Sequence, residues 1–139
     1  AYKSDEGSIG LSIQLPFEAT ANDYIDKLVD CRYFFTRKVF FLKYAQAFIG
    51  YPGGFGTLDE LFETLTLIQC GHMREVPVVL VGSDYWSGIV DWMKKTMYEK
   101  EGNLSEKDFD LFKVVNTPED AMSYILNNIE SDKKEDINF

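Results

Sequence analysis

The residues best suited to chemistry stand in one short stretch, from Pro52 to Glu60, which reads PGGFGTLDE. Its three glycines, Gly53, Gly54 and Gly56, would let the backbone turn tightly and approach a ligand closely. A helix is predicted to start at Thr57, so free N–H groups and the positive end of the helix dipole would meet at this loop. That combination suits a phosphate group.

Two common phosphate loops do not describe this stretch. A P-loop would end in Gly-Lys-Ser or Gly-Lys-Thr. The dinucleotide fingerprint would show the spacing G-x-G-x-x-G. Neither pattern is present between Pro52 and Glu60, so the loop must be interpreted on its own residues.

Glu60 can be interpreted in two ways. The run from Thr57 to Glu60 fits a capping box, in which the two end side chains each satisfy a free N–H group at the start of the helix. Alternatively, a carboxylate beside a phosphate loop would face the sugar of a bound nucleotide. There it could stabilise positive charge on the ribose ring or hold an attacking water molecule. The spacing alone leaves both open.

Two cations, Arg37 and Lys38, follow Thr36, the predicted N-cap of an apolar helix. A helix dipole disfavours cations at this end, so another group should compensate for them. A surface ion pair would be sufficient. Alternatively, Arg37 points to the strand ends and meets phosphate, base or Glu60. Glu18 follows a predicted strand and would also lie at a carboxyl edge.

The elements that must position these residues alternate along the chain. We predict strands at 8–15, 31–35, 47–51, 76–81 and 111–115, and helices at 38–44, 57–71, 85–99 and from 118 onward. This order is typical of a parallel α/β sheet with helices on both faces, whose ligands bind at the carboxyl ends of the strands. We expect one domain over residues 1–139, with a charged tail at 131–139.

Apolar residues spaced three and four apart predict the buried faces of the helices. The helix after the glycine loop should bury Leu58, Leu61, Phe62, Leu65 and Ile68 and leave Thr64 off this stripe. The next helix should begin with Asp84 as its N-cap and bury Trp92 among other residues. The helix at 38–44 is so densely apolar that we expect it to be largely buried.

Composition limits the classes of partner. The chain has 139 residues, 45% of them hydrophobic, and a net charge of −9. This charge argues against nucleic acid and anionic membranes as general partners, although a local nest of N–H groups can still bind one nucleotide. We expect Cys31 and Cys70 to be buried, reduced thiols of a cytoplasmic protein. With one histidine, His72, we expect no metal site.

The glycine stretch, with Arg37-Lys38 about twenty residues before it, resembles the P-G-G-x-G-T-x-x-E signature of the LONELY GUY (LOG) family, also labelled "possible lysine decarboxylase". The resemblance covers about Ser8 to Tyr124. One departure is Phe35-Thr36, where many members have methionine and histidine. Members normally begin with a further βαβ unit, so we expect this chain to represent the C-terminal part of the fold.

The resemblance implies a Rossmann-like fold, a homodimer with its site near the interface, and a nucleoside 5′-monophosphate substrate. Members hydrolyse the N-glycosidic bond of adenine-type and cytokinin nucleotides. By position, Arg37 and Glu60 would be catalytic, with Lys38 and Glu18 as further candidates. The phosphate would be held by Gly53, Gly54, Gly56 and Thr57.

No cofactor is expected. Lysine decarboxylation would need pyridoxal phosphate on a Schiff-base lysine with a partner for the pyridinium, and Lys38 and Lys43 are the only lysines near the predicted site. Two other functional classes stay open beside the hydrolase. The loop could belong to a nucleotide-binding module without turnover, or it could serve only as a helix cap.

Overall fold

The computed structural model describes residues 7–13 and 23–135, with side chains up to residue 129. The chain folds into two compact units, Ala1–Tyr44 and Ala45–Phe139. Strands and helices are interleaved in the second unit, two strands precede a helix in the first, and every strand pair in the described residues is parallel. The predicted α/β class with parallel strands and interleaved helices, a partial Rossmann-like fold, is therefore confirmed.

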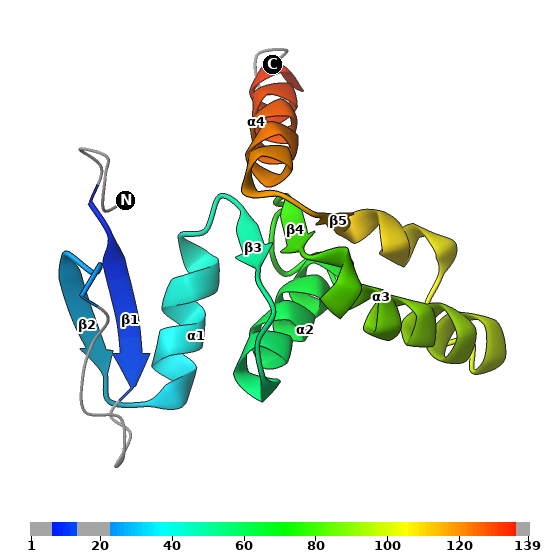
Figure 1. The fold of residues 1–139 in the computed structure, drawn as a ribbon, viewed down its shortest axis with the longest axis horizontal. Helices are drawn as coiled ribbons and strands as arrows, with labels where there is room; N and C mark the ends of the chain where they lie inside the picture. Colours follow the sequence, from blue (N-terminus) through cyan, green and yellow to red (C-terminus); the bar gives the residue numbers. More distant parts are fainter. Residues whose placement is uncertain (1–6, 14–22, 136–139) are drawn as a thin grey trace. The chain divides into compact units, whose positions relative to one another are not determined.

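In the described residues, the first unit holds two strands and one helix (Figure 1). Strand β1 (Ile9–Ile13) pairs in parallel with β2 (Lys27–Cys31), and α1 (Phe34–Lys43) contacts both strands. Ser8 joins the strand starts, because its N–H and hydroxyl donate to the Asp26 carboxylate at 2.6 and 2.7 Å. These hydrogen bonds hold the pKa of Asp26 below its ordinary value.

The strand predicted at 31–35 is wrong. Strand β2 ends at Cys31, and the aromatic residues that suggested a strand begin α1, with Tyr33 as its N-cap in place of Thr36. Aromatic residues favour strands only weakly, and packing of α1 against β1 and β2 overrides that preference. The helix is also less buried than expected, since Leu42 is its one buried residue.

The second unit is built on β4 (Val78–Val81), which lies between β3 (Phe48–Gly50) and β5 (Lys113–Val115). Each residue of β4 is at most 5% exposed. Its β-branched, uninterrupted apolar sequence is what a parallel strand covered on both faces requires. The predicted central strand is confirmed.

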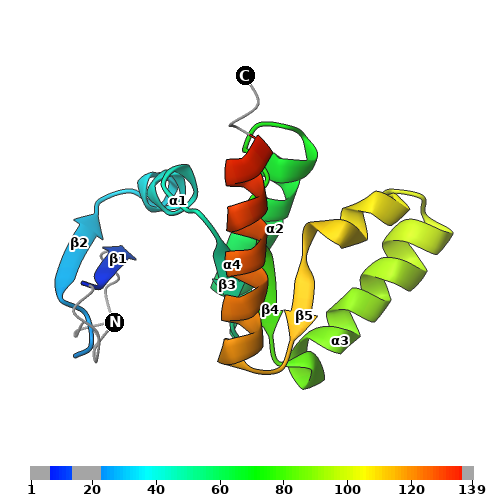
Figure 2. The same ribbon diagram turned by 90° about the horizontal axis from the view of Figure 1, so that it is seen from above.

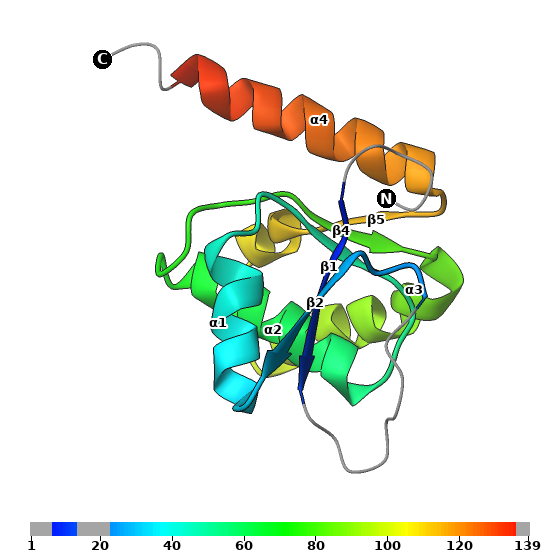
Figure 3. The same ribbon diagram turned by 90° about the vertical axis from the view of Figure 1, so that its left-hand side faces the viewer.

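Helices cover both faces of this sheet (Figures 2 and 3). Side chains alternate along β4, so Val78 and Leu80 join one core cluster and Val79 and Val81 join another. The first cluster takes in α2 (Phe55–Gln69) and α3 (Ser83–Trp92). The second is closed by α4 (Pro118–Glu135), whose Ala121 and Ile125 are buried.

Helix α2 has the predicted apolar stripe. Leu61, Leu65 and Ile68 are buried, and Leu58 and Phe62 pack against them. Thr64, expected off the stripe, is fully buried instead. Its hydroxyl donates to the Glu60 carbonyl oxygen at 2.7 Å. Without this hydrogen bond, the Thr64 hydroxyl would be buried without a partner.

Glycine marks the turn after α2 and the start of α3. Helix α2 ends at Gln69 with Cys70 as its C-cap, and Gly71 follows with a left-handed φ of 69°. The His72 N–H closes the turn onto the Leu67 carbonyl at 2.9 Å. Gly82, with φ of 102°, is the N-cap of α3. The predicted cap at Asp84 is wrong, because this residue lies inside the first turn of the helix.

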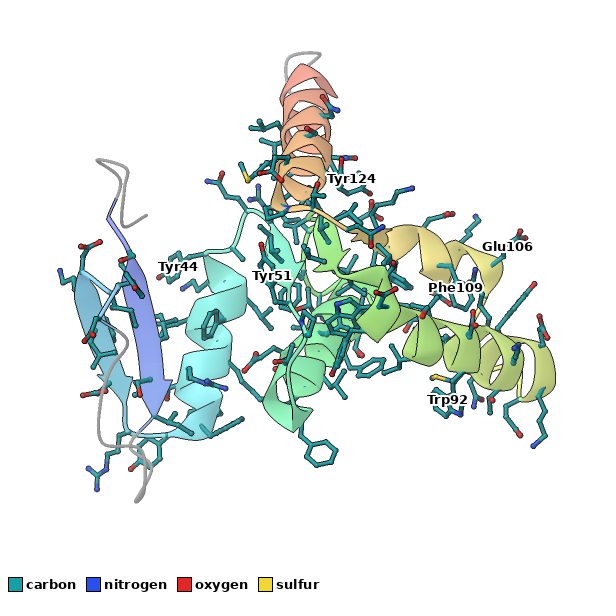
Figure 4. All side chains as sticks on the ribbon, in the orientation of Figure 1. Tyr44, Tyr51, Trp92, Glu106, Phe109 and Tyr124 are labelled. Carbon is teal, nitrogen blue, oxygen red and sulfur yellow. The ribbon has the colours of Figure 1, made fainter. Side chains whose placement is uncertain are left out.

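Helix α3 continues directly into η1 (Met93–Lys100), a π-helix, and η2 (Glu106–Leu111) is a 3₁₀ helix that leads to β5. Phe109 packs edge-on against Tyr98, which fastens η2 to η1 (Figure 4). Trp92 is 53% exposed and points away from the sheet, so its predicted burial is wrong (Figure 4).

Helix α4 begins at Pro118 as predicted, and its backbone runs to Glu135, into the segment expected as a charged tail. Cys31 is a buried free cysteine as expected, whereas Cys70 is exposed at the end of α2. Of the helices in the described ranges, none has both the length and the apolar character needed to cross a membrane.

A capping box fixes the start of η2, and its contribution to the stability of the protein can be predicted. The Asp108 carboxylate accepts from the Ser105 N–H and hydroxyl at 2.6 and 2.9 Å and from Gln69 at 2.8 Å. Partial burial raises its pKa, but these hydrogen bonds prevail and hold the pKa below the ordinary value of 3.8. Asp108→Ala should therefore lower the free energy of unfolding by about 1 kcal/mol.

Urea unfolding at pH 7 measures this loss. The folded carboxyl has the lower pKa, so its contribution is complete above about pH 3.8 and fades as the pH falls through the folded pKa. The difference between wild type and Asp108→Ala should shrink below that pH. A difference that grew on acidification would contradict the assignment. Asp110→Ala, in the same helix, is the matched control.

Candidate functional site

The candidate site lies where the strands of the second unit end. Because β3, β4 and β5 are parallel, Gly50, Val81 and Val115 end at one edge of the sheet. The glycine loop follows Gly50 there, and Gly82 and Asn116 follow the other two strands. The sequence prediction that the loop lies at a carboxyl edge agrees with this arrangement.

Helix α2 starts at Phe55, two residues earlier than predicted. Gly54 is the N-cap, with extended backbone at φ −94°, and its carbonyl accepts from the N–H groups of Thr57 and Leu58 at 3.1 and 3.2 Å. Within the described structure, no side chain caps this helix end. The capping box between Thr57 and Glu60 is therefore wrong, because Thr57 already lies inside the helix.

This geometry leaves peptide donors at the loop. The first N–H groups of a helix have no acceptor within it, and Gly54, Phe55 and Gly56 supply them here. The aligned peptides add positive potential at the same place. The loop therefore offers an anion both N–H groups and a favourable field.

The three loop glycines differ in what the fold demands of them. None has a positive φ, so the backbone does not require glycine at any of them. At Gly53 an added Cβ would stand 2.1 Å from the Thr57 hydroxyl oxygen, which packing forbids. At Gly54 and Gly56 an added Cβ would meet no described atom within 4 Å. Packing therefore explains why a glycine is needed at position 53 but not why glycines stand at positions 54 and 56.

Glu60 stands one turn after Gly56 and Thr57 on α2, on the same side of the helix. It is partly buried. Helical side chains lean toward the N-terminus of their helix, so that of Glu60 leans toward the loop. The helix spacing therefore agrees with the functional interpretation of Glu60, which stays a prediction.

Two side-chain hydrogen bonds at this edge of the sheet escaped the sequence prediction. The Tyr85 hydroxyl donates to the Gly53 carbonyl at 2.5 Å. The Asn116 side chain accepts from the Ser83 N–H at 3.0 Å and so ties the end of β5 to the start of α3. Asn116 comes directly after β5, and that position was its one signal in the sequence. Tyr85 lies inside the first turn of α3, where no sequence signal marked it.

Arg37 belongs to the first unit. Its guanidinium lies over the rings of Phe34 and Phe41, at 5.0 and 5.8 Å from their centroids. These rings stand three residues before and four after it on α1, and such contacts restrict where the guanidinium can point. Lys38 also stacks on Phe34, at 5.6 Å. The prediction that both cations lie at the start of the helix is wrong, because α1 starts at Phe34.

The structure brings together the loop glycines, Thr57 and Glu60, all in the second unit. The pairing of Arg37 with Glu60 stays a prediction. Glu18 lies outside the described residues, so its candidate role also stays a prediction.

Comparison with known proteins gives the family. The family described as possible lysine decarboxylase matches residues 1–125. This chain belongs to the possible lysine decarboxylase, or LOG, family.

Relatives within the family have a more specific description. The cytokinin riboside 5′-monophosphate phosphoribohydrolase LOG3 of Arabidopsis thaliana is 39% identical over 64 residues, which are 45% of this chain and 29% of that protein. The enzyme LOG of Oryza sativa is 46% identical over 48 residues, 34% of this chain and 19% of the relative. A bifunctional cytokinin biosynthesis protein of Fusarium pseudograminearum is 34% identical over 75 residues, which are 53% of this chain and 15% of that protein. The matched stretches thus span less than a third of each relative.

The family's label does not fit the site of this LOG-family chain. Pyridoxal phosphate would need a lysine for its Schiff base, and the stretch from Pro52 to Glu60 has none. Lys38 and Lys43 lie on α1, against the rings of Phe34 and Tyr44. The loop itself therefore offers no lysine for that cofactor.

This LOG-family chain has a cavity away from the loop. The cavity, of about 480 Å³, lies at the opposite, amino end of the sheet, where Pro77 precedes β4 and Glu75 and Lys107 line the wall. Across the described ranges, no three His, Cys, Asp or Glu side chains gather as metal ligands would.

Proposed function

We propose that this chain carries the phosphate- and sugar-binding part of a phosphoribohydrolase. The reaction is hydrolysis of the N-glycosidic bond of an adenosine 5′-monophosphate, in its unmodified or N6-modified (cytokinin) form. The products are the free base and ribose 5-phosphate. The observation that carries the proposal is the open space at Gly54 and Gly56, where neither backbone nor packing explains a glycine.

Phosphate fits that space. Side chains at Gly54 and Gly56 would fill the room that a phosphate needs in order to reach the N–H groups at the start of α2. Thr57 adds a hydroxyl beside Gly53. Such a local nest can attract an anion although the chain as a whole carries a charge of −9.

Glu60 acts on the sugar. When the bond between the ribose carbon C1′ and the base nitrogen breaks, its electron pair leaves with the base and positive charge develops on the ribose ring. A carboxylate one turn from the phosphate stabilises this charge and accepts a proton from the water that attacks C1′. The base leaves with one proton, and the water oxygen becomes the hydroxyl of ribose 5-phosphate.

Arg37 supplies the positive counterpart in this proposal. Its guanidinium, held by Phe34 and Phe41, orients the phosphate or the leaving base. A homodimer completes the site, as the family resemblance implies.

Product analysis tests the proposal. Incubation of the intact protein with AMP or N6-modified AMP should release free base and ribose 5-phosphate in equal amounts, measured by chromatography. Adenosine, which lacks the phosphate, should be turned over at least about tenfold less efficiently, because each lost charge-assisted hydrogen bond contributes about 1.5–3 kcal/mol.

The outcomes separate the functional classes. Binding of AMP without release of base would indicate a nucleotide-binding module in place of a hydrolase. No effect of AMP on the melting temperature, together with no product, would leave the loop as a structural helix start only.

A further inference from the structure

We propose that Tyr85 is a positioning residue that holds the glycine loop in its phosphate-binding shape. This inference rests on the function proposed above. Tyr85 lies on α3, in a different element from the loop, and its hydroxyl donates to the Gly53 carbonyl 32 residues away.

The hydrogen bond fixes a peptide rather than a single atom. The Gly53 carbonyl and the Gly54 N–H belong to one planar, trans peptide, so they point in opposite directions. A hydroxyl that holds the carbonyl on one side therefore aims the N–H to the other. Because glycine stands on both sides of this peptide, nothing in the local backbone would otherwise prevent it from turning over.

Tyr85 can act as a brace because it is itself held. Its N–H donates to the Gly82 carbonyl at 3.1 Å. Its ring meets the ring of Trp86 edge-on at 4.9 Å. Trp86 is fully buried and donates its indole N–H to the Val81 carbonyl at 3.2 Å. The Tyr85 hydroxyl that holds the loop is thus anchored, through Trp86, to the end of the central strand β4.

A second contact acts in the same direction. A Cβ placed on Gly82 would lie 3.6 Å from the Pro52 ring, so the start of α3 also lies against the start of the loop. The loop is held at Pro52 and at Gly53, directly before the donors at the start of α2. The loop is therefore already ordered in the folded protein. Phosphate binding does not have to provide the free energy of ordering it.

Removal of the hydroxyl should loosen the loop and leave the chemistry intact. In Tyr85→Phe, the N–H groups of Thr57 and Leu58, which bond to the Gly54 carbonyl, should exchange with deuterium roughly five- to tenfold faster. The KM for AMP and the Kd for inorganic phosphate should rise by a similar factor with kcat little changed, because phosphate binding is shared by substrate and transition state.

Tyr98→Phe is the matched control. Tyr98 is 38% exposed against 42% for Tyr85, and its ring packs on Phe109 far along the chain from the loop. That variant should change neither the exchange of Thr57 and Leu58 nor phosphate affinity. A lower melting temperature alone, with exchange and affinity as in wild type, would overturn the positioning role.

The two readouts separate this inference from the proposed function. Exchange in the ligand-free protein decides whether Tyr85 orders the loop, whatever the loop binds. Wild-type protein that neither binds nor hydrolyses AMP would overturn the proposed function. Equal exchange and equal phosphate affinity in wild type and Tyr85→Phe would overturn the role of Tyr85.

Discussion

Glu60→Gln is expected to reduce the release of free base from AMP by roughly 10²–10⁴-fold. The amide keeps the shape of the carboxylate but can neither carry negative charge against the developing ribose cation nor accept a proton from water. Since Glu60 takes no part in a capping box in this structure, the substitution removes no helix cap. The variant should therefore stay folded.

The measurement compares kcat for AMP in wild type, Glu60→Gln and Asp59→Asn. Asp59 is the exposed acidic neighbour on the same helix, so Asp59→Asn matches the change in charge without touching the proposed site. AMP should still raise the melting temperature of Glu60→Gln, because the phosphate loop is unchanged. Wild-type turnover in Glu60→Gln would remove Glu60 from the mechanism.

The second unit was largely predictable because its signals are local. Strand β4 is an uninterrupted β-branched run, and α2 shows apolar residues at helical spacing, so sequence alone located both. The start of α2 was misplaced because Thr57, with Glu60 three residues later, matches a capping box, and Gly54 has no side chain to give such a signal. The error mattered, since it produced the competing capping-box interpretation of Glu60.

The first unit was less predictable because its signals conflict. The aromatic run from Tyr33 to Phe35 suggested a strand, whereas it begins α1. Strand β2 was overlooked because Lys27 and Asp30 interrupt its apolar residues. Packing decides such segments, and sequence patterns do not report packing.

The brace on the loop could not be predicted at all. Tyr85 and Gly53 are 32 residues apart, and no periodic pattern relates them. Contacts of this kind follow from the register of β3 beside β4, which aligns Gly50 with Leu80 and so sets the two following loops side by side. The glycine motif could be recognised from sequence, whereas what holds it in shape required the fold.

Gly53→Ala should damage both the fold and the site. The new methyl group would stand 2.1 Å from the Thr57 hydroxyl oxygen and 2.9 Å from its Cβ, so the loop or the first turn of α2 must shift. Overpacking of this kind lowers the free energy of unfolding by about 1–3 kcal/mol. The displaced peptide and hydroxyl should raise the Kd for AMP by at least about tenfold.

Gly56→Ala separates the two effects. Gly56 lies inside α2 with open space around it, so alanine should stabilise the helix by about 0.5–1 kcal/mol. Its methyl group would nevertheless occupy the space assigned to phosphate, and AMP affinity should fall. Thermal unfolding and calorimetry would then show a variant that is more stable than wild type but binds AMP less tightly. A stabilised Gly56→Ala with unchanged AMP affinity would show that phosphate does not approach this glycine, because a site that needs the open space cannot tolerate its loss.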